Sequence, residues 1–226
     1  MIFRYFSIYI ILLACCVTGC STATDRSPYP LSTSPAQAPI QRRDFVDSFL
    51  QGYWCEAEIQ YTKSLESSLR SDDFCAAAKT AKLAARLRAY LDMDAGVLEQ
   101  EARRYAKAAL DCPGSLEQRT QRDKDYETLI EERNYLRLER SLKAEKDSLF
   151  ASVYARKAAR TAIAQGDDTT ALTLIELARI RDARQGWVTF LREDWRLRLS
   201  IEDNPQKRQA INDRIRILDD QIFPCD

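Results

Sequence analysis

The sequence predicts an all-α fold, and two observations on residues 41–226 support it. Glycine and proline occur at only eight positions there, and the segments between them are rich in the good helix formers Ala, Leu, Arg, Glu, Lys and Gln. No segment with turn signals on both sides alternates between polar and apolar residues, as a half-buried strand would. We therefore expect antiparallel helical hairpins, arranged either as a bundle or as a repeat array.

The first two helices are predicted from apolar spacing and from a capping signal. Asp72-Asp73 can cap a helix, because an Asp carboxylate accepts hydrogen bonds from the unbonded N–H groups of the first turn. Before this cap, one stripe recurs every four residues and indicates a single helix: Phe45, Phe49, Tyr53, Ala57, Tyr61, Leu65 and Leu69. After the cap, the expected buried face consists of Ala77, Ala81, Ala84 and Leu87.

Similar signals delimit three more helices. Asp92 or Asp94 is expected to cap one that ends at Pro113-Gly114, Gly166-Asp167-Asp168 begins another, and Asn204-Pro205 begins the last. The helix after Asp92 or Asp94 has apolar positions at Leu98, Ala102, Tyr105 and Ala109. The helix after Gly166 has them at Ala171, Leu174, Ile175 and Ala178, and the last helix has them at Ile211, Ile215, Leu218 and Ile222.

Residues 115–165 contain neither glycine nor proline. A single helix of this length would extend ~75 Å, so we expect a break near Asp147-Ser148. The charged part before the break has two interpretations. One is a solvated helix with ion pairs such as Glu139–Lys143. The other is a coiled-coil helix along Leu129, Leu136 and Phe150.

The N-terminus has the layout of a secretory signal. Arg4 is followed by an apolar run from Tyr5 to Val17, which is too short for a membrane span of ~20 residues. The run ends in Val17-Thr18-Gly19-Cys20, which resembles the lipobox of bacterial lipoproteins. The resemblance implies cleavage before Cys20, acylation of Cys20 with palmitate-type chains and, because Ser21 is not Asp, sorting to the outer membrane. An ordinary cleaved signal is the alternative.

We expect three segments: a lipoprotein signal peptide at 1–19, a lipidated Cys20 with a linker at 20–40, and a helical domain at 41–226. Four of the seven prolines lie in the linker among Ser, Thr and Ala, and this composition cannot bury a core. An extended linker at ~3.1 Å per residue would hold the domain up to ~60 Å from the bilayer as a disordered tether.

Residues 155–183 resemble a tetratricopeptide-type unit, which is a pair of closely packed helices. Small residues occupy both predicted helices around the turn at Gly166, namely Ala155, Ala158, Ala159, Ala162, Ala171 and Ala178. The resemblance implies a divergent tetratricopeptide-like array. Ala162 stands where tyrosine is usual and Ala183 where proline is usual, so a nonrepetitive helical domain stays open.

Two shorter resemblances point to peptidoglycan. Gly52-Tyr53 and Asp72-Asp73-Phe74 are similar to the helical region before peptidoglycan-binding modules in some outer-membrane lipoproteins, but no such module follows. Glu66-Ser67-Ser68 is similar to the catalytic glutamate-serine pair of lytic transglycosylases, but their Gly-rich Met-Gln segment is missing.

Composition excludes several kinds of chemistry. Histidine is absent, which excludes Ser-His-Asp and Cys-His nucleophilic sites and histidine-ligated metals. The absence of a CxxC pair argues against a structural zinc site, and Asp72-Asp73 and Asp167-Asp168 are interpreted as helix caps. Cleavage before Cys20 would leave 33 basic and 34 acidic residues, a balance that gives no reason to expect a nucleic-acid partner. We expect neither enzyme activity nor a cofactor.

Four cysteines besides Cys20 would be exported, and an even number in an oxidising compartment favours two disulfides. Cys75 and Cys112 are equidistant from Asp92-Met93-Asp94, where we expect a hairpin turn, so they are predicted to face each other. The remaining pair, Cys55 and Cys225, would tie the C-terminal tail to the first helix.

An aromatic cluster has two interpretations. Trp187, Phe190, Leu191 and Trp195 lie among arginines, a combination that is typical of interface hot spots but equally compatible with a packed core. Together with the lipobox, these features predict a lipid-anchored outer-membrane protein that faces the periplasm and acts as an interaction or scaffold module for envelope proteins. An accessory subunit of a secretion or conjugation machine and a peptidoglycan-acting protein are the alternatives.

Overall fold

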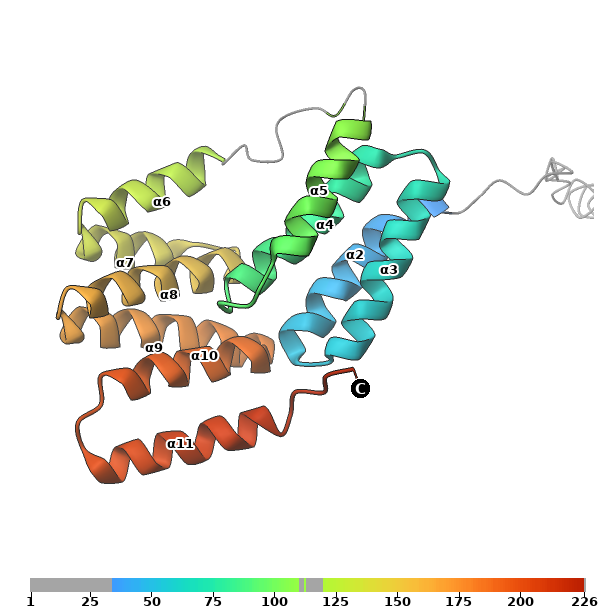
Figure 1. The fold of residues 1–226 in the computed structure, drawn as a ribbon. Helices are drawn as coiled ribbons and strands as arrows, with labels where there is room; N and C mark the ends of the chain where they lie inside the picture. Colours follow the sequence, from blue (N-terminus) through green and yellow to red (C-terminus); the bar gives the residue numbers. More distant parts are fainter. Residues whose placement is uncertain (1–33, 110–111, 113–119, 226) are drawn as a thin grey trace, which may run out of the picture. The chain divides into compact units, whose positions relative to one another are not determined.

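A computed structural model describes residues 34–109, 112 and 120–225 (Figure 1). Within these ranges the backbone forms ten helices and no named strand, which confirms the predicted all-α fold. The predicted signal peptide, Cys20 and most of the predicted linker lie outside the described residues.

The helices follow one another as five hairpins. Their bounds are α2 (Ser34–Gln51) and α3 (Trp54–Arg70), α4 (Phe74–Ala89) and α5 (Gly96–Ala108), α6 (Gln121–Glu131) and α7 (Tyr135–Ala144), α8 (Ser148–Ala164) and α9 (Asp168–Gln185), and α10 (Val188–Ser200) and α11 (Pro205–Asp219). Figure 1 shows α8, α9, α10 and α11 side by side in chain order, and α10 also contacts α2.

Several predicted caps are confirmed. The carboxylate of Asp73 accepts a hydrogen bond from the Ala76 N–H at 2.8 Å, and Asp167 and Asn204 cap α9 and α11 in the same way. Asp94 accepts from the Gly96 N–H at 2.9 Å, one residue ahead of the N-cap position of α5. Local hydrogen bonding therefore determines where these helices begin.

The predicted single helix over 45–69 is wrong. The chain turns at Gly52, whose φ is 91°, and continues as α3. The apolar stripe nevertheless marks the core, because Phe45 of α2 and Tyr61 of α3 are both buried, with ring centroids 5.7 Å apart. The fourfold spacing continues across the turn by coincidence, which hid the hairpin from a pattern-based prediction.

The predicted domain boundary at residue 41 is also wrong, because α2 begins at Ser34. Ala38 is buried, and its carbonyl accepts a hydrogen bond from the Ser64 hydroxyl of α3 at 3.0 Å. Pro35 lies in the first turn of α2, where backbone N–H groups have no helical partner, so its missing N–H has little effect. Residues 34–40 are therefore part of the helical domain.

The region from 120 to 165 breaks twice. The predicted break is confirmed, with Asp147 capping α8. A second break was not predicted: Arg133 has a φ of 57° and Asn134 caps α7. Because Leu129 and Leu136 fall on separate helices and Leu136 is 62% exposed, the coiled-coil interpretation is wrong. The Glu139–Lys143 ion pair of the other interpretation is present.

The hairpin of α8 and α9 packs through alanines. Six small side chains with no exposed surface form this interface or its surroundings: Ala155, Ala158, Ala159, Ala162, Ala171 and Ala178. Alanine carries no bulky side chain, which allows two helices to approach closely. The tetratricopeptide resemblance itself stays a prediction.

The C-terminal tail closes onto the turn between α2 and α3. The Phe223 N–H donates to the Gly52 carbonyl at 2.8 Å, and the Phe223 carbonyl accepts from the N–H groups of Trp54 at 3.1 Å and Cys55 at 3.4 Å. The rings of Tyr53 and Phe223 stack with centroids 5.9 Å apart. Since no side chain caps α3, the Phe223 carbonyl satisfies the first donors of this helix.

We expect Gly52→Ala to lower the free energy of unfolding by about 1–3 kcal/mol. Alanine disfavours the φ of Gly52, and its Cβ would lie 2.9 Å from the Gln221 carbonyl oxygen. Gly166→Ala is the matched control, because Gly166 also has a positive φ but nothing lies within 4 Å of an added Cβ. Urea unfolding should show a larger loss for Gly52→Ala, and equal losses would contradict the close approach of the tail.

Candidate protein-binding groove on α9, α10 and α11

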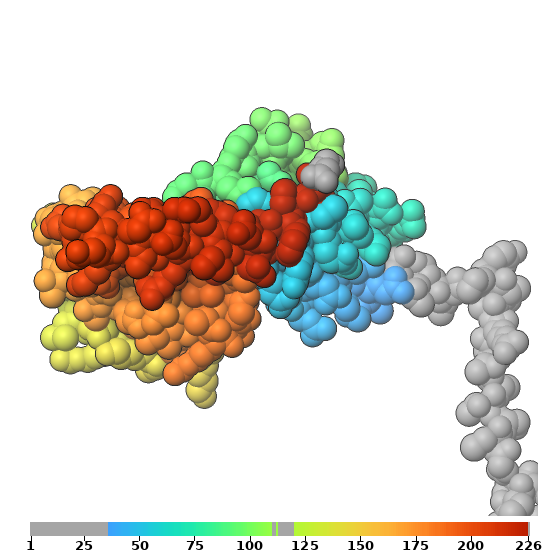
Figure 2. Space-filling model, turned by 90° about the horizontal axis from the view of Figure 1, so that it is seen from below, coloured from blue at the N-terminus to red at the C-terminus, as the bar shows by residue number. Residues whose placement is uncertain are grey.

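A groove of about 560 Å³ lies between α9, α10 and α11, and we call it the Trp195 groove. Its lining residues are Ile175, Glu176, Arg179, Trp195, Arg198, Glu202, Lys207, Ala210, Ile211 and Arg214. The hairpin of α10 and α11 supplies one wall and α9 the other. Figure 2 shows α11 running along this face of the helical domain, with the C-terminal tail beyond it.

The predicted aromatic cluster is divided between the core and this groove. Trp187 and Phe190 are buried and pack edge to face, with ring centroids 6.1 Å apart. Trp195 is half-buried and lines the groove. The core interpretation therefore holds for Trp187 and Phe190, whereas Trp195 lines the groove.

Two guanidinium groups lie against the Trp195 ring. The distances from the ring centroid are 5.5 Å to the Arg179 guanidinium carbon and 4.5 Å to that of Arg214, both within range for a cation–π contact. Arg179 also donates to both carboxylate oxygens of Glu176, at 2.8 and 2.6 Å. These bonds lower the pKa of Glu176 and raise the pKa of Arg179, so the pair stays ionised.

The second carboxylate of the groove is also paired. Glu202 lies 3.4 Å from the Arg198 guanidinium and accepts a hydrogen bond from the Asn204 N–H at 3.3 Å. Desolvation raises the pKa of Glu202, but the bonds from Asn204 and Arg198 outweigh it, so the pKa is lowered. Glu202 is therefore ionised at neutral pH.

The groove carries an excess of positive charge. Four cationic and two anionic side chains line it. Arg179 and Arg198 are paired as described, whereas Lys207 and Arg214 form no ion pair with any residue that the structure describes. Lys207 in the groove and Arg214 at the Trp195 ring thus carry positive charge that no carboxylate pairs with among the described residues.

A buried ionic cluster joins the helices behind the groove. The Arg156 Nε of α8 lies 2.9 Å from Asp194 of α10, and its Nη2 bonds Asp182 of α9 and, at 2.7 Å, the Ser152 hydroxyl. The guanidinium also lies 4.0 Å from the Phe190 ring centroid. Arg156 is 2% exposed and both carboxylates are 0% exposed, so the cluster is structural.

Burial raises the pKa of Asp182 and raises that of Asp194 further, because the Asp182 charge adds to the effect on Asp194. One oxygen of each carboxylate has no hydrogen-bond partner among the described residues. This cluster was not predicted. Its indication in the sequence is a charged residue within an alanine-rich helix face, because Arg156 lies between Ala155 and Ala158.

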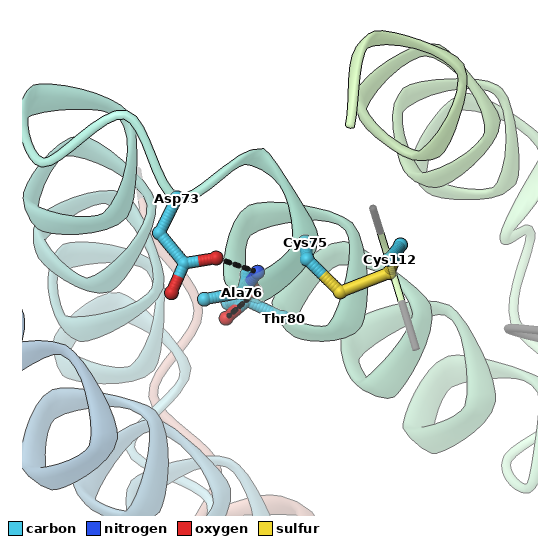
Figure 3. Close-up of a disulfide and its surroundings, with 5 residues drawn as sticks. All are labelled: Asp73, Cys75, Ala76, Thr80 and Cys112. Carbon is cyan, nitrogen blue, oxygen red and sulfur yellow. Dashed lines mark hydrogen bonds between the residues drawn. A yellow bond between two sulfur atoms is a disulfide. The ribbon is translucent and has the colours of Figure 1, made fainter. Parts of the chain in front are cut away.

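The predicted Cys75–Cys112 disulfide is present, with Cα atoms 5.2 Å apart (Figure 3). Cys55 is an exposed thiol, and the predicted second bridge to Cys225 is not formed in the described structure. The two segments are nevertheless adjacent through the bonds of Phe223. Glu66 lies on the exposed face of α3, 3.2 Å from Arg70, away from the groove.

In the described ranges, no cluster of three or more His, Cys, Asp or Glu residues is placed to hold a metal ion. No described helix combines the length and apolarity that crossing a bilayer requires. Comparisons of the chain with protein-family models, with curated proteins and with solved structures found no match.

Proposed function

We propose that this protein is a lipid-anchored outer-membrane protein whose helical domain faces the periplasm and binds another envelope protein. The observation that carries the proposal is the Trp195 groove, where a half-buried tryptophan is in contact with arginines from two helices. Tryptophan and arginine are enriched at the few positions that dominate binding energy in protein interfaces. The groove would be the binding surface of the module.

The anchoring part of the proposal is supported by the lipobox-like Val17-Thr18-Gly19-Cys20. Acyl chains on Cys20 would hold the protein at the membrane, because more than one chain is needed for stable anchoring and this class carries three. The helical domain begins at Ser34, so the segment between the lipid and α2 is shorter than the predicted linker.

Site-specific photocrosslinking in intact envelopes tests the binding part. A photoreactive residue at position 210 of the full chain, where an exposed alanine lines the groove, should give a discrete protein adduct, identified by mass, that Trp195→Ala abolishes. The same residue at position 59, an exposed site on α3, is the control and should give no such adduct. Absence of a Trp195-dependent adduct at position 210 would overturn the proposal.

The anchoring part predicts that Cys20→Ala abolishes palmitate incorporation and releases the protein from membranes. The reason is that the lipid would be attached to the sulfur and the new amino group of Cys20. Radiolabelled palmitate and membrane fractionation measure both effects, with Cys55→Ala as a matched control that should keep the label. Unchanged labelling of Cys20→Ala would exclude a lipobox.

A further inference from the structure

We propose that the Trp195 groove binds a short acidic segment of its protein partner, with carboxylates of that segment held by Lys207 and Arg214. This inference rests on the proposed function and adds the chemistry of the partner. It is carried by the charge balance of the groove and by the spacing of its two unpaired cations.

Glu176 and Glu202 line the groove, and each is bonded to an arginine. The charge of Lys207 helps to lower the pKa of Glu202, but the two side chains form no ion pair. With four cationic and two anionic side chains, the groove keeps an excess of positive charge, which repels a basic segment at close range. An acidic segment would instead complete the charge pairing, and arginine can bind a carboxylate through two parallel hydrogen bonds.

The geometry of α11 determines the distance between Lys207 and Arg214. Lys207 and Arg214 are seven residues apart on α11, which places them on one face about 10.5 Å apart along the axis at 1.5 Å per residue. An extended polyproline-type segment repeats every three residues with a rise of about 9 Å. Acidic residues three positions apart would therefore match the two cations.

The apolar part of the groove favours a peptide over a small anion. Trp195 is half-buried and lines the same space as the cations, above the buried Ile175 and Ile211. A free phosphate or sulfate would satisfy the charges but leave the exposed part of the tryptophan ring in contact with water. A peptide with an apolar residue between two acidic ones would cover the tryptophan and pair the charges at the same time.

Fluorescence polarisation with labelled peptides tests the inference on the full mature chain. The probes are extended peptides with two glutamates at spacings of two, three and four residues around a leucine, and matched peptides with glutamine. We expect the glutamate peptides to bind, with three-residue spacing strongest, and the glutamine peptides to bind about a hundredfold more weakly. Binding should also weaken as salt is raised.

Two charge-reversal variants localise the binding. Lys207→Glu combined with Arg214→Glu should weaken peptide binding about a hundredfold. Arg216→Glu is the control, because Arg216 lies on the same helix, is exposed, pairs with Asp213 and does not line the groove. An equal loss for Arg216→Glu would overturn the inference, because attraction would then be nonspecific.

Further measurements distinguish an acidic peptide from a free phosphate and from an anionic membrane surface. Failure of every glutamate peptide, equal binding of the glutamine peptides, or full competition by inorganic phosphate at low millimolar concentration would overturn the inference. Stronger binding to vesicles of phosphatidylglycerol than to peptides would assign the groove to a membrane surface instead. The photocrosslinking adduct at position 210 keeps both Lys207 and Arg214 and reports on the proposed function separately, so the failure of one can be told from that of the other.

Discussion

Replacing Arg156 with methionine is expected to lower the free energy of unfolding by about 3–5 kcal/mol. Arg156 contacts the carboxylates of Asp182 and Asp194, and all three side chains are buried. Methionine fills a similar volume but leaves two carboxylates without a positive charge inside the protein. Urea denaturation of the mature chain, followed by circular dichroism, measures the loss.

Arg160→Met is the matched control for this prediction. Arg160 lies one turn along α8 and pairs with Asp92, whose side chain is 72% exposed. Surface pairs of this kind contribute at most about 1 kcal/mol. Similar losses for the two variants would show that the buried ion pairs of Arg156 contribute no more to stability than a surface pair.

The pH dependence of stability provides a second readout of the same cluster. Burial raises the pKa of Asp194 above its unfolded value, so the folded protein binds this proton more tightly than the unfolded chain does. The resulting stabilisation is fully present below the unfolded pKa of ~3.9 and is lost as the pH rises through the folded pKa. Asp194→Asn removes this titration while keeping the shape of the side chain. The stability of Asp194→Asn relative to the native protein should therefore increase as the pH rises above the unfolded pKa of ~3.9, and a constant difference would contradict a raised pKa.

Much of the helix pattern was predictable because caps are local. Asp73, Asp147, Asp167 and Asn204 each accept a hydrogen bond from the backbone N–H three residues ahead, so a short segment contains all that is needed to recognise them. The Cys75–Cys112 pairing was predictable for a related reason. In an antiparallel hairpin, positions equidistant from the turn face each other. Cys75 lies in the first turn of α4, and Cys112 follows α5, which ends at Ala108 and not at Pro113-Gly114 as predicted.

The turn at Gly52 was not predictable from local sequence. Its backbone is held by Phe223, which follows it by more than 170 residues. The apolar stripe gave no warning, because Phe49 and Ala57 are buried whether the chain continues or turns between them. The contacts of Phe223 therefore determine the turn at Gly52, although the four-residue apolar spacing predicts a continuous helix.

The Trp195 groove could not be predicted either, although its tryptophan was singled out. The groove exists because α9 and α11 both pack on α10, which brings Arg179 and Arg214 to the same tryptophan ring. Residues 35 positions apart have no periodic relation in the sequence. The buried cluster of Arg156 illustrates the same limit, since its partners lie on two other helices.

Removing the disulfide by a combined Cys75→Ser and Cys112→Ser substitution should lower the free energy of unfolding by about 4 kcal/mol. The bridge spans 37 residues, and the chain-entropy model gives this magnitude for a loop of that length. The α4–α5 hairpin depends on it, because the hairpin has a small separate core built mainly from alanines: Ala77, Ala78, Ala81, Ala102 and Tyr105.

The loss should be concentrated in α5. This helix packs on α4, and its other ties include the hydrogen bond from Tyr61 to Glu101 at 2.9 Å. Hydrogen exchange of the double variant should therefore accelerate in α5 far more than in α8 or α9.

Cys55→Ser distinguishes the contribution of the Cys75–Cys112 disulfide from that of the second predicted disulfide, Cys55–Cys225. Because Cys55 is an exposed thiol in the structure, its substitution should leave stability within about 0.5 kcal/mol of the native value. A loss as large as that of the double variant, together with a Cys55–Cys225 peptide in nonreducing mapping, would show that export adds a bridge between the tail and α3. A Cys55–Cys75 peptide would instead contradict the α4–α5 hairpin, since Cys75 can bond only one partner.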